Sequence, residues 1–139
     1  NTMLGNLAAR GITLAPEVDI REYITDMDTC MSAADLVICR AGAITLSELE
    51  ACGKPAVLIP SPYVAENHQY HNAMTLKKAG AAEVIEEKDL TGESLITAVS
   101  KLIEDKKALE DMQKADKKIA ITDSNERIYK VIKELSAEK

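Results

Sequence analysis

A short turn of small residues is the feature of this sequence that best fits an anion-binding site. The segment Cys39-Arg40-Ala41-Gly42-Ala43-Ile44-Thr45 leads from an apolar run into a stretch with helical spacing. Such a turn leaves several backbone N–H groups unpaired at the start of the helix, where the helix dipole also favours negative charge. The small side chains of Ala41, Gly42 and Ala43 let a phosphate approach these amides. Because strand-to-helix turns also need small residues for close packing, the turn alone leaves a purely structural role open.

A carboxylate follows one turn further along the same expected helix. In one interpretation Thr45-Leu46-Ser47-Glu48 is a capping box, in which Thr45 is the N-cap and Glu48 reaches back to its amide. In the other, Glu48 is a buried carboxylate that accepts hydrogen bonds from two vicinal hydroxyls, as an acidic residue does for a nucleotide ribose. The spacing of these residues fits both interpretations.

A second polar segment runs from Ser61 to Asn72 and contains both histidines of the chain. Its amide side chains suit the recognition of hydroxyl groups. His68 or His71 has the right chemistry for an acid or a base, but the sequence gives neither of them a carboxylate or nucleophile partner, so a surface histidine is the simpler interpretation. No serine, cysteine or lysine lies in a nucleophile motif, and no Cys/His spacing fits zinc. We therefore expect no metal and no cofactor.

The elements that position these residues follow from hydrophobic periodicity. Short apolar runs alternate with helical segments, which is typical of an α/β domain with a Rossmann-like parallel sheet and helices on both faces. We expect strands over residues 18–24, 36–39, 56–59 and 82–85, helices over residues 26–34, 43–51 and 67–79, and mainly helical structure over residues 92–139. Ligands of such sheets bind beyond the carboxyl ends of the strands, so the loops after Ile24, Cys39, Ile59 and Ile85 should border the site.

This inventory of strands is short for a complete domain. A doubly wound sheet usually has about five or six strands, and the first residue, Asn1, is not an initiator methionine. We therefore expect residues 1–139 to be a single domain that lacks at least one N-terminal strand and helix. Residues 1–10 should then be the tail of a helix.

The amino-acid composition limits the binding partners and the cellular compartment that we expect for this chain. The 139 residues are 46% hydrophobic and contain neither Phe nor Trp, which predicts an ordinary globular domain with an aliphatic core. A formal charge of −6 without a Lys/Arg tract argues against nucleic acid, and against an anionic membrane surface for this chain alone. The apolar runs are far shorter than the ~20 residues of a membrane span, and no signal peptide opens the chain. An odd set of three cysteines favours reduced thiols, so we expect a cytoplasmic protein.

Several motifs, specific in combination, resemble one family of bacterial glycosyltransferases. They are the Cys39–Ala43 turn with Ser47-Glu48, then Gly53-Lys54-Pro55, Ile59-Pro60, Glu66-Asn67-His68-Gln69 and Asn72-Ala73. The chain resembles the C-terminal half of the MurG family, the UDP-N-acetylglucosamine transferases that convert lipid I to lipid II in peptidoglycan synthesis. The resemblance extends over residues 20–91, and the helical tail matches in pattern only.

The resemblance implies a two-domain enzyme of the GT-B type, in which two Rossmann-like domains face each other across a cleft and the C-terminal one holds the UDP-sugar. This chain would be most of that donor domain, without its first strand, its glycine-rich loop and the whole N-terminal domain. The missing domain would bind the lipid I acceptor, supply the general base and contact the inner face of the bacterial cell membrane as a peripheral protein. We therefore expect no turnover from this chain alone and only weak binding of UDP.

The resemblance also assigns donor contacts to named positions. They are Ile24 and Met27 for the uracil; Gly42, Ala43, Ile44 and Thr45 for the diphosphate; Glu48 for the ribose; and His68, Gln69 and Asn72 for N-acetylglucosamine. The amides of the Gly42–Thr45 turn would stabilise the charge that develops on the departing UDP. Arg40 either assists them or serves as a structural ion-pair partner.

Two other functions fit the same residues. One is a related GT-B transferase that uses another UDP-hexose or a glycolipid acceptor, and the segment from Glu66 to Asn72 would make that choice. The other is a non-catalytic, nucleotide-binding α/β module. Competition between donors tests the first, and a second Rossmann-like half upstream of Asn1 would exclude the second.

Overall fold

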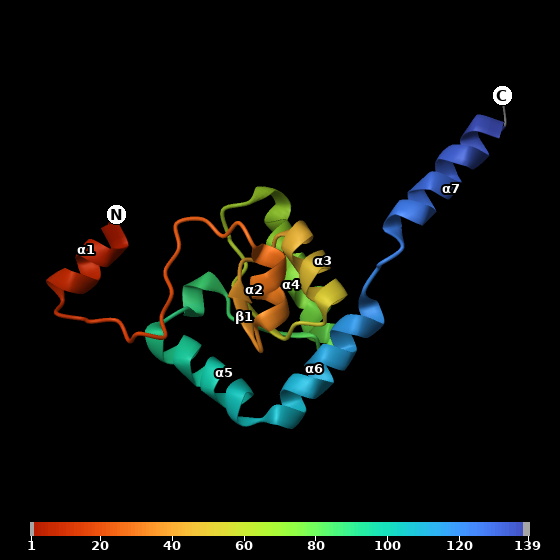
Figure 1. Cartoon of the computed structure of the whole chain (residues 1–139). Helices are drawn as coiled ribbons and strands as arrows, with labels where there is room; N and C mark the ends of the chain where they lie inside the picture. The colour runs from red at the N-terminus through yellow and green to blue at the C-terminus, as the bar shows by residue number, and fades with distance from the viewer. Residues whose placement is uncertain (1, 138–139) are drawn as a thin grey trace.

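The computed structural model describes residues 2–137, which form a small α/β core with helices extending from it (Figure 1). The elements in chain order are α1 (Thr2–Ala9), α2 (Met27–Ala33), β1 (Val37–Cys39), α3 (Ala43–Cys52), β2 (Ala56–Leu58), η1 (Ala65–Asn67), α4 (His68–Ala79), β3 (Ala82–Val84), η2 (Glu87–Asp89), α5 (Gly92–Glu104), α6 (Lys106–Ile119) and α7 (Ser124–Ala137). The helical predictions for Asn1 and residues 138–139 lie outside the described residues. The helices predicted over residues 26–34, 43–51 and 67–79 are confirmed as α2, α3 and α4.

The sheet has three parallel strands in the order β1-β2-β3, with Ala56 of β2 paired to Val37 and to Ala82. The central strand β2 is buried throughout, which explains its uninterrupted apolar sequence. Its residues alternate between two faces, because successive side chains of a strand point in opposite directions. Leu58 packs on the side of α3 and α4, and Val57 packs against Leu102 of α5 and Met112 of α6. The predicted Rossmann-like sheet with helices on both faces is therefore confirmed.

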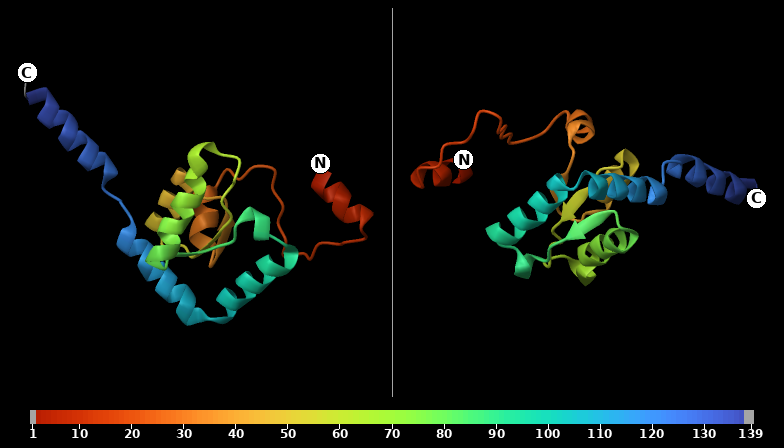
Figure 2. Two further views of the ribbon diagram at one scale, coloured as in Figure 1. Left: turned by 180° about the vertical axis from the view of Figure 1, so that it is seen from behind. Right: turned by 90° about the horizontal axis from the view of Figure 1, so that it is seen from below.

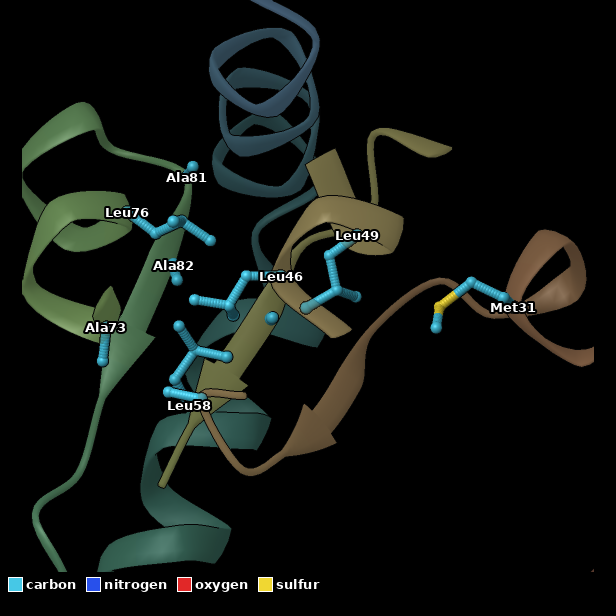
Figure 3. Close-up of a cluster of buried hydrophobic side chains, with 10 residues drawn as sticks. Met31, Leu46, Leu49, Leu58, Ala73, Leu76, Ala81 and Ala82 are labelled. Carbon is cyan, nitrogen blue, oxygen red and sulfur yellow. The ribbon is translucent and has the colours of Figure 1, made fainter. Parts of the chain in front are cut away.

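The larger core cluster lies between the sheet and helices α3 and α4 (Figure 3). Leu46 of α3, Leu58 of β2 and Leu76 of α4 point toward one another there, and all three are buried. Alanines such as Ala73 and Ala82 fill the remaining positions, so the backbones of α4 and β3 can approach closely. The core is aliphatic, as the absence of Phe and Trp predicts.

Glycines end α3 and α4. Gly53 follows α3 with φ 61°, and Gly80 follows α4 with φ 76°. Both conformations lie in the left-handed region, which glycine adopts without the penalty that a Cβ brings. Each helix therefore stops at a defined residue and returns the chain to the next strand.

The strand predicted over residues 18–24 is wrong. Val18 is 49% exposed and Ile20 is 39% exposed, and no strand is assigned between α1 and α2. Arg21 pairs instead with Asp19 (2.7 Å) and Asp26 (2.8 Å), side chains of its own segment. An alternating pattern becomes a strand only where a neighbour supplies the hydrogen-bond ladder, and β1 is an edge of the described sheet.

The helical prediction after residue 92 is confirmed as far as Ala137 by α5, α6 and α7. Helices α5 and α6 meet at an angle beside the sheet, whereas α1 and α7 extend away from the core at opposite sides of the molecule (Figures 1 and 2). Neither α1 nor α7 contains a buried residue. Within residues 2–137, no helix combines the length and the apolar character that crossing a bilayer requires.

Candidate functional site

The loops after β1, β2 and β3 meet at one edge of the sheet. Arg40 follows β1, and its Nη1 donates to the carbonyl oxygen of Ile59 after β2 (3.2 Å) and to a carboxylate oxygen of Glu87 after β3. On α4, Nδ2 of Asn72 donates to the carbonyl oxygen of Ala41 (3.4 Å). Parallel strands bring their carboxyl ends to the same edge, so residues far apart in the chain form one surface here.

The N-terminus of α3 opens onto this edge, and we call the backbone amides of residues 42–45 the α3 mouth. Gly42 is the N-cap, in an extended conformation (φ −70°, ψ 141°), and no side chain caps the helix. Its carbonyl oxygen accepts the first helical hydrogen bond, from the amide of Leu46 (3.0 Å). A Cβ placed on Gly42 would have no other atom within 4 Å, and the side chain of Ile44 is 78% exposed. The α3 mouth therefore presents unpaired N–H groups in open space.

The capping-box interpretation of Thr45 and Glu48 is wrong. Helix α3 begins at Ala43, so Thr45 is already inside its first turn and Glu48 lies one turn further along. The extended backbone of Gly42 lets the first turn form before Thr45 is reached. The Glu48 side chain is also exposed, not buried. Its carboxylate is thus available to a ligand at the surface, next to the α3 mouth.

Two polar residues of the N-terminal half of α4, Gln69 and Asn72, bond to the loops at this edge, and His68 precedes them. Oε1 of Gln69 accepts a hydrogen bond from the amide of Ser61 (3.0 Å), which orients the side-chain amide and leaves its Nε2 group for a ligand. Asn72 is tied to Ala41 by the bond given above. Nδ1 of His68 lies 2.9 Å from the carbonyl oxygen of Ala65, so this exposed ring is turned toward its own loop.

The turn that leads into α4 has an uncommon backbone. Glu66 and Asn67 both have φ 51°, in the left-handed region that residues other than glycine rarely occupy. Each such residue costs on the order of 1 kcal/mol, and conformations of this kind concentrate at binding sites. Here the two residues set the direction in which His68 and Gln69 leave the loop.

The predicted uracil contacts, Ile24 and Met27, lie at the N-terminal end of α2. Ile24 is half-buried in the loop before α2, and Met27 is the first residue of that helix, 46% exposed. Helix α2 packs on α3 through Met31. No hydrogen bond of the described chain joins Ile24 or Met27 to the α3 mouth.

The predicted phosphate contact Arg40 has protein partners of its own. Its ion pair with Glu87 is the arrangement expected of a structural partner. Sequence reasoning named the loop after Ile85 as a border of the site but missed Glu87 within it. The signal was present, since Glu87 lies in the loop after β3, three residues beyond its last residue, Val84.

A second residue that the sequence did not reveal is Asp116 on α6. Its side chain is fully buried, and neither carboxylate oxygen has a hydrogen-bond partner among residues 2–137. Burial, with a further contribution from the charge of Glu50 on α3, raises the pKa of Asp116 to about 7. Glu50 lies near the C-terminal end of α3. The Asp116 carboxyl group, which is close enough to feel its charge, is therefore at the opposite end of α3 from the α3 mouth.

Several hollows of the described surface lie away from the α3 mouth. Two hollows of about 970 and 600 Å³ border α5 and α6. A smaller hollow of about 150 Å³ lies beside Glu87, between Pro60 and Tyr70. Within residues 2–137, no group of three or more His, Cys, Asp or Glu side chains is arranged to hold a metal ion.

A family model and the similar proteins of known name both point to glycosyltransferases. The family model described as "Glycosyltransferase family 28 C-terminal domain" matches residues 5–133. A protein of Acetivibrio thermocellus is 50% identical over 129 residues (93% of this chain, 35% of its own length), and one of Bacillus licheniformis is 43% identical over 121 residues (87% and 33%). Both are named UDP-N-acetylglucosamine--N-acetylmuramyl-(pentapeptide) pyrophosphoryl-undecaprenol N-acetylglucosamine transferase.

A solved structure agrees with these relatives. The crystal structure of Acinetobacter baumannii MurG superimposes with a TM-score of 0.82 at 29% identity, over 93% of this chain and 38% of that one. The chain thus spans about a third of the length of the curated relatives it matches, for instance 35% and 33% in the two named above.

Proposed function

The chain belongs to the glycosyltransferase family 28 C-terminal domain family, and from this premise we propose that it binds UDP-N-acetylglucosamine as the donor-binding part of an N-acetylglucosamine transferase. The observation that carries the proposal is the open, uncapped α3 mouth, whose preceding residue Ala41 accepts a hydrogen bond from Asn72 of α4, one helical turn after Gln69. A nucleoside diphosphate sugar needs such neighbours: amides for the diphosphate and an oriented side-chain amide for the sugar hydroxyls.

In this proposal the donor lies along the carboxyl edge of the sheet. Its diphosphate accepts hydrogen bonds from the α3 mouth, and Glu48 accepts the ribose hydroxyls about 4.5 Å further along α3, the rise of three helical residues. Gln69, with His68 beside it and Asn72 one turn on, reaches the N-acetylglucosamine ring. Ile24 and Met27 stand at the uracil end.

The chemistry that this arrangement supports is departure of UDP from the anomeric carbon. Negative charge grows on the diphosphate as the glycosidic bond breaks, and amides fixed at the α3 mouth stabilise it without reorganising. The relatives' names describe transfer of N-acetylglucosamine. We propose that in this transfer the C4 hydroxyl of the lipid-linked N-acetylmuramoyl group attacks the anomeric carbon with inversion, so that lipid I becomes lipid II for the cell wall. The acceptor, the general base and the contact with the cytoplasmic face of the membrane belong, in this proposal, to residues outside this chain.

Titration of the ¹⁵N-labelled chain with UDP tests the nucleotide site directly. We expect UDP at millimolar concentration to shift the amide resonances of residues 42–45, and ADP at the same concentration to shift them much less. Binding that moves resonances elsewhere, or no movement at these residues, would contradict the proposal. A Kd in the micromolar range would show that this chain needs no further residues for its nucleotide site.

The sugar that the chain prefers distinguishes the proposed N-acetylglucosamine donor site from that of a related GT-B transferase with another UDP-hexose donor. We expect UDP-N-acetylglucosamine, but not UDP, to shift the side-chain amide resonances of Gln69, and UDP-glucose to shift them less. Equal responses to both sugars would favour a transferase with another donor.

Transfer itself can be tested in a chimera in which this chain replaces the matching third of the Acetivibrio thermocellus relative. Activity of the chimera supports the transferase, and a folded but inactive chimera that still binds UDP supports the non-catalytic module.

A further inference from the structure

One guanidinium group links the ends of all three strands. Nη1 of Arg40, directly after β1, donates to the carbonyl oxygen of Ile59 after β2 and to the carboxylate of Glu87 after β3. The side chains of Arg40 and Glu87 are 50% and 31% exposed. An ion pair so accessible to water adds little to stability, but it fixes the position of the Arg40 side chain against the ends of β2 and β3.

That geometry acts on the residues immediately before the α3 mouth. Arg40 is held from β2 and β3, and the next residue, Ala41, is fully buried and held by Asn72 of α4. Gly42 follows and begins the α3 mouth. The position of the mouth relative to Gln69 on α4 is therefore set from both sides by bonds between different loops.

We propose that Glu87 is a positioning residue of the donor site. It holds Arg40 against Ile59, so that Arg40 braces the turn before the α3 mouth and does not bind the diphosphate itself. This inference rests on the function proposed above. It assigns a role to the β3 end of the sheet, whose residues have no part in the expected donor contacts.

Direct binding of the diphosphate by Arg40 would predict the opposite effect of Glu87 substitutions on the affinity for UDP. If Arg40 bound the diphosphate directly, Glu87 would compete for it, and removing the charge of Glu87 would strengthen UDP binding. If Glu87 positions the turn, removing its charge weakens UDP binding. The sign of the effect therefore separates the two roles.

The experiment measures UDP and uridine binding to the Glu87→Gln and Glu87→Ala variants by ¹⁵N NMR titration, with the unsubstituted chain beside them. We expect Glu87→Ala to weaken UDP about threefold to tenfold, and Glu87→Gln to weaken it less, because glutamine can still accept a bond from Arg40. Uridine, which has no diphosphate, should bind all three proteins alike. A change in the fold alone would weaken both ligands.

The matched control is Glu83→Gln, which removes the charge of another carboxylate that pairs with a cation, Lys77 (3.6 Å). It should leave UDP binding unchanged. UDP binding that is equal or tighter in the Glu87 variants would overturn the positioning role while leaving the proposed function intact. If the unsubstituted chain shows no UDP-dependent shift at residues 42–45, the proposed function fails, and the inference fails with it.

Discussion

The two ends of helix α3 are built in opposite ways. At its N-terminus Gly42 has open space around it and no side chain caps the amides. At its C-terminus Gly53 is left-handed, and its amide and that of Lys54 donate to the carbonyl oxygens of Glu50 (3.1 Å) and Leu49 (2.9 Å). The Lys117 side chain of α6 also lies against Gly53, since a Cβ placed there would be 2.6 Å from its Cε.

This difference indicates that the C-terminal end of α3, the closed end, contributes to stability, whereas its N-terminal end, the open end, is available for binding. The closed end satisfies its own carbonyl groups and packs on α6, as a structural helix end does. The open end leaves its amides to solvent or to a ligand, although one serine or aspartate at position 42 would have capped them. Substitutions at the closed end should therefore change the free energy of unfolding, and substitutions at the open end should change the affinity for UDP.

The largest expected effect is at the closed end, at Asp116. Its pKa of about 7 in the folded chain is above the ordinary 3.8, so the folded state binds more protons, and stability falls as the pH rises from about 4 to about 7. We expect Asp116→Asn to stabilise the chain at pH 8 by about 2 to 4 kcal/mol, with the gain vanishing near pH 4. Urea unfolding at both pH values measures this.

Asp111→Asn is the control for that substitution, because Asp111 is on the same helix but exposed, next to Lys114 (3.4 Å). It should change stability by less than ~0.5 kcal/mol at either pH. UDP binding should be unaltered in both variants. A gain from Asp116→Asn that is independent of pH would mean that the carboxyl group is not the source of the effect.

Much of the fold could be predicted because its signals are local. Gly53 and Gly80 each end a helix through their own left-handed backbone, which depends little on the rest of the fold. Strand β2 is apolar at every position, as a strand buried on both faces is expected to be. The segment around Val18 and Ile20 shows where this reasoning ends. Its alternation describes a side-chain pattern, whereas a strand also requires a neighbour, and β1 forms an edge of the described sheet.

The site was predictable to a similar extent. The Gly42 turn and the polar segment after β2 that runs into α4 with Gln69 follow from the rule that ligands bind beyond strand ends. The start of α3 could not be fixed, because Thr45 with Glu48 has the spacing of a capping box while the extended backbone of Gly42 begins the helix earlier. The pairing of Arg40 with Glu87 spans 47 positions, and only the parallel order of the strands brings them together.

At the open end, Gly42→Asp should have the next largest effect. The φ of −70° at Gly42 suits any residue, and a carboxylate there would cap the amides and repel the diphosphate. We expect UDP binding to weaken about 30- to 100-fold, while stability rises by a few tenths of a kcal/mol. NMR titration and urea unfolding measure the two quantities. Gly42→Ala, which adds a methyl group without a cap, should keep most of the affinity, and a Gly42→Asp variant that binds UDP normally would place the diphosphate elsewhere.

The corresponding change at the closed end is Gly53→Ala. It forces a Cβ into the left-handed conformation at φ 61° and displaces the flexible side chain of Lys117, so we expect a loss of about 1 to 2 kcal/mol of stability. The affinity for UDP should stay the same when it is measured well below the melting temperature. Gly92→Ala in the first turn of α5, where a Cβ meets no atom within 4 Å, is the control and should not destabilise the chain. If Gly53→Ala weakened UDP binding as well, the two ends of α3 would not be independent.

The smallest effect is expected from Glu48→Gln. Because Glu48 is exposed and takes no part in a capping box, its charge contributes little to folding, and the melting temperature should not change. A carboxylate that accepts two ribose hydroxyls binds them more strongly than an amide does, so UDP should bind about threefold to tenfold more weakly, a change of about 1 kcal/mol. The 2′-deoxy analogue of UDP, which lacks one hydroxyl, should lose less affinity on the substitution than UDP does. Equal losses for the two nucleotides would show that Glu48 acts through its charge alone, and the open end would then recognise the diphosphate but not the ribose.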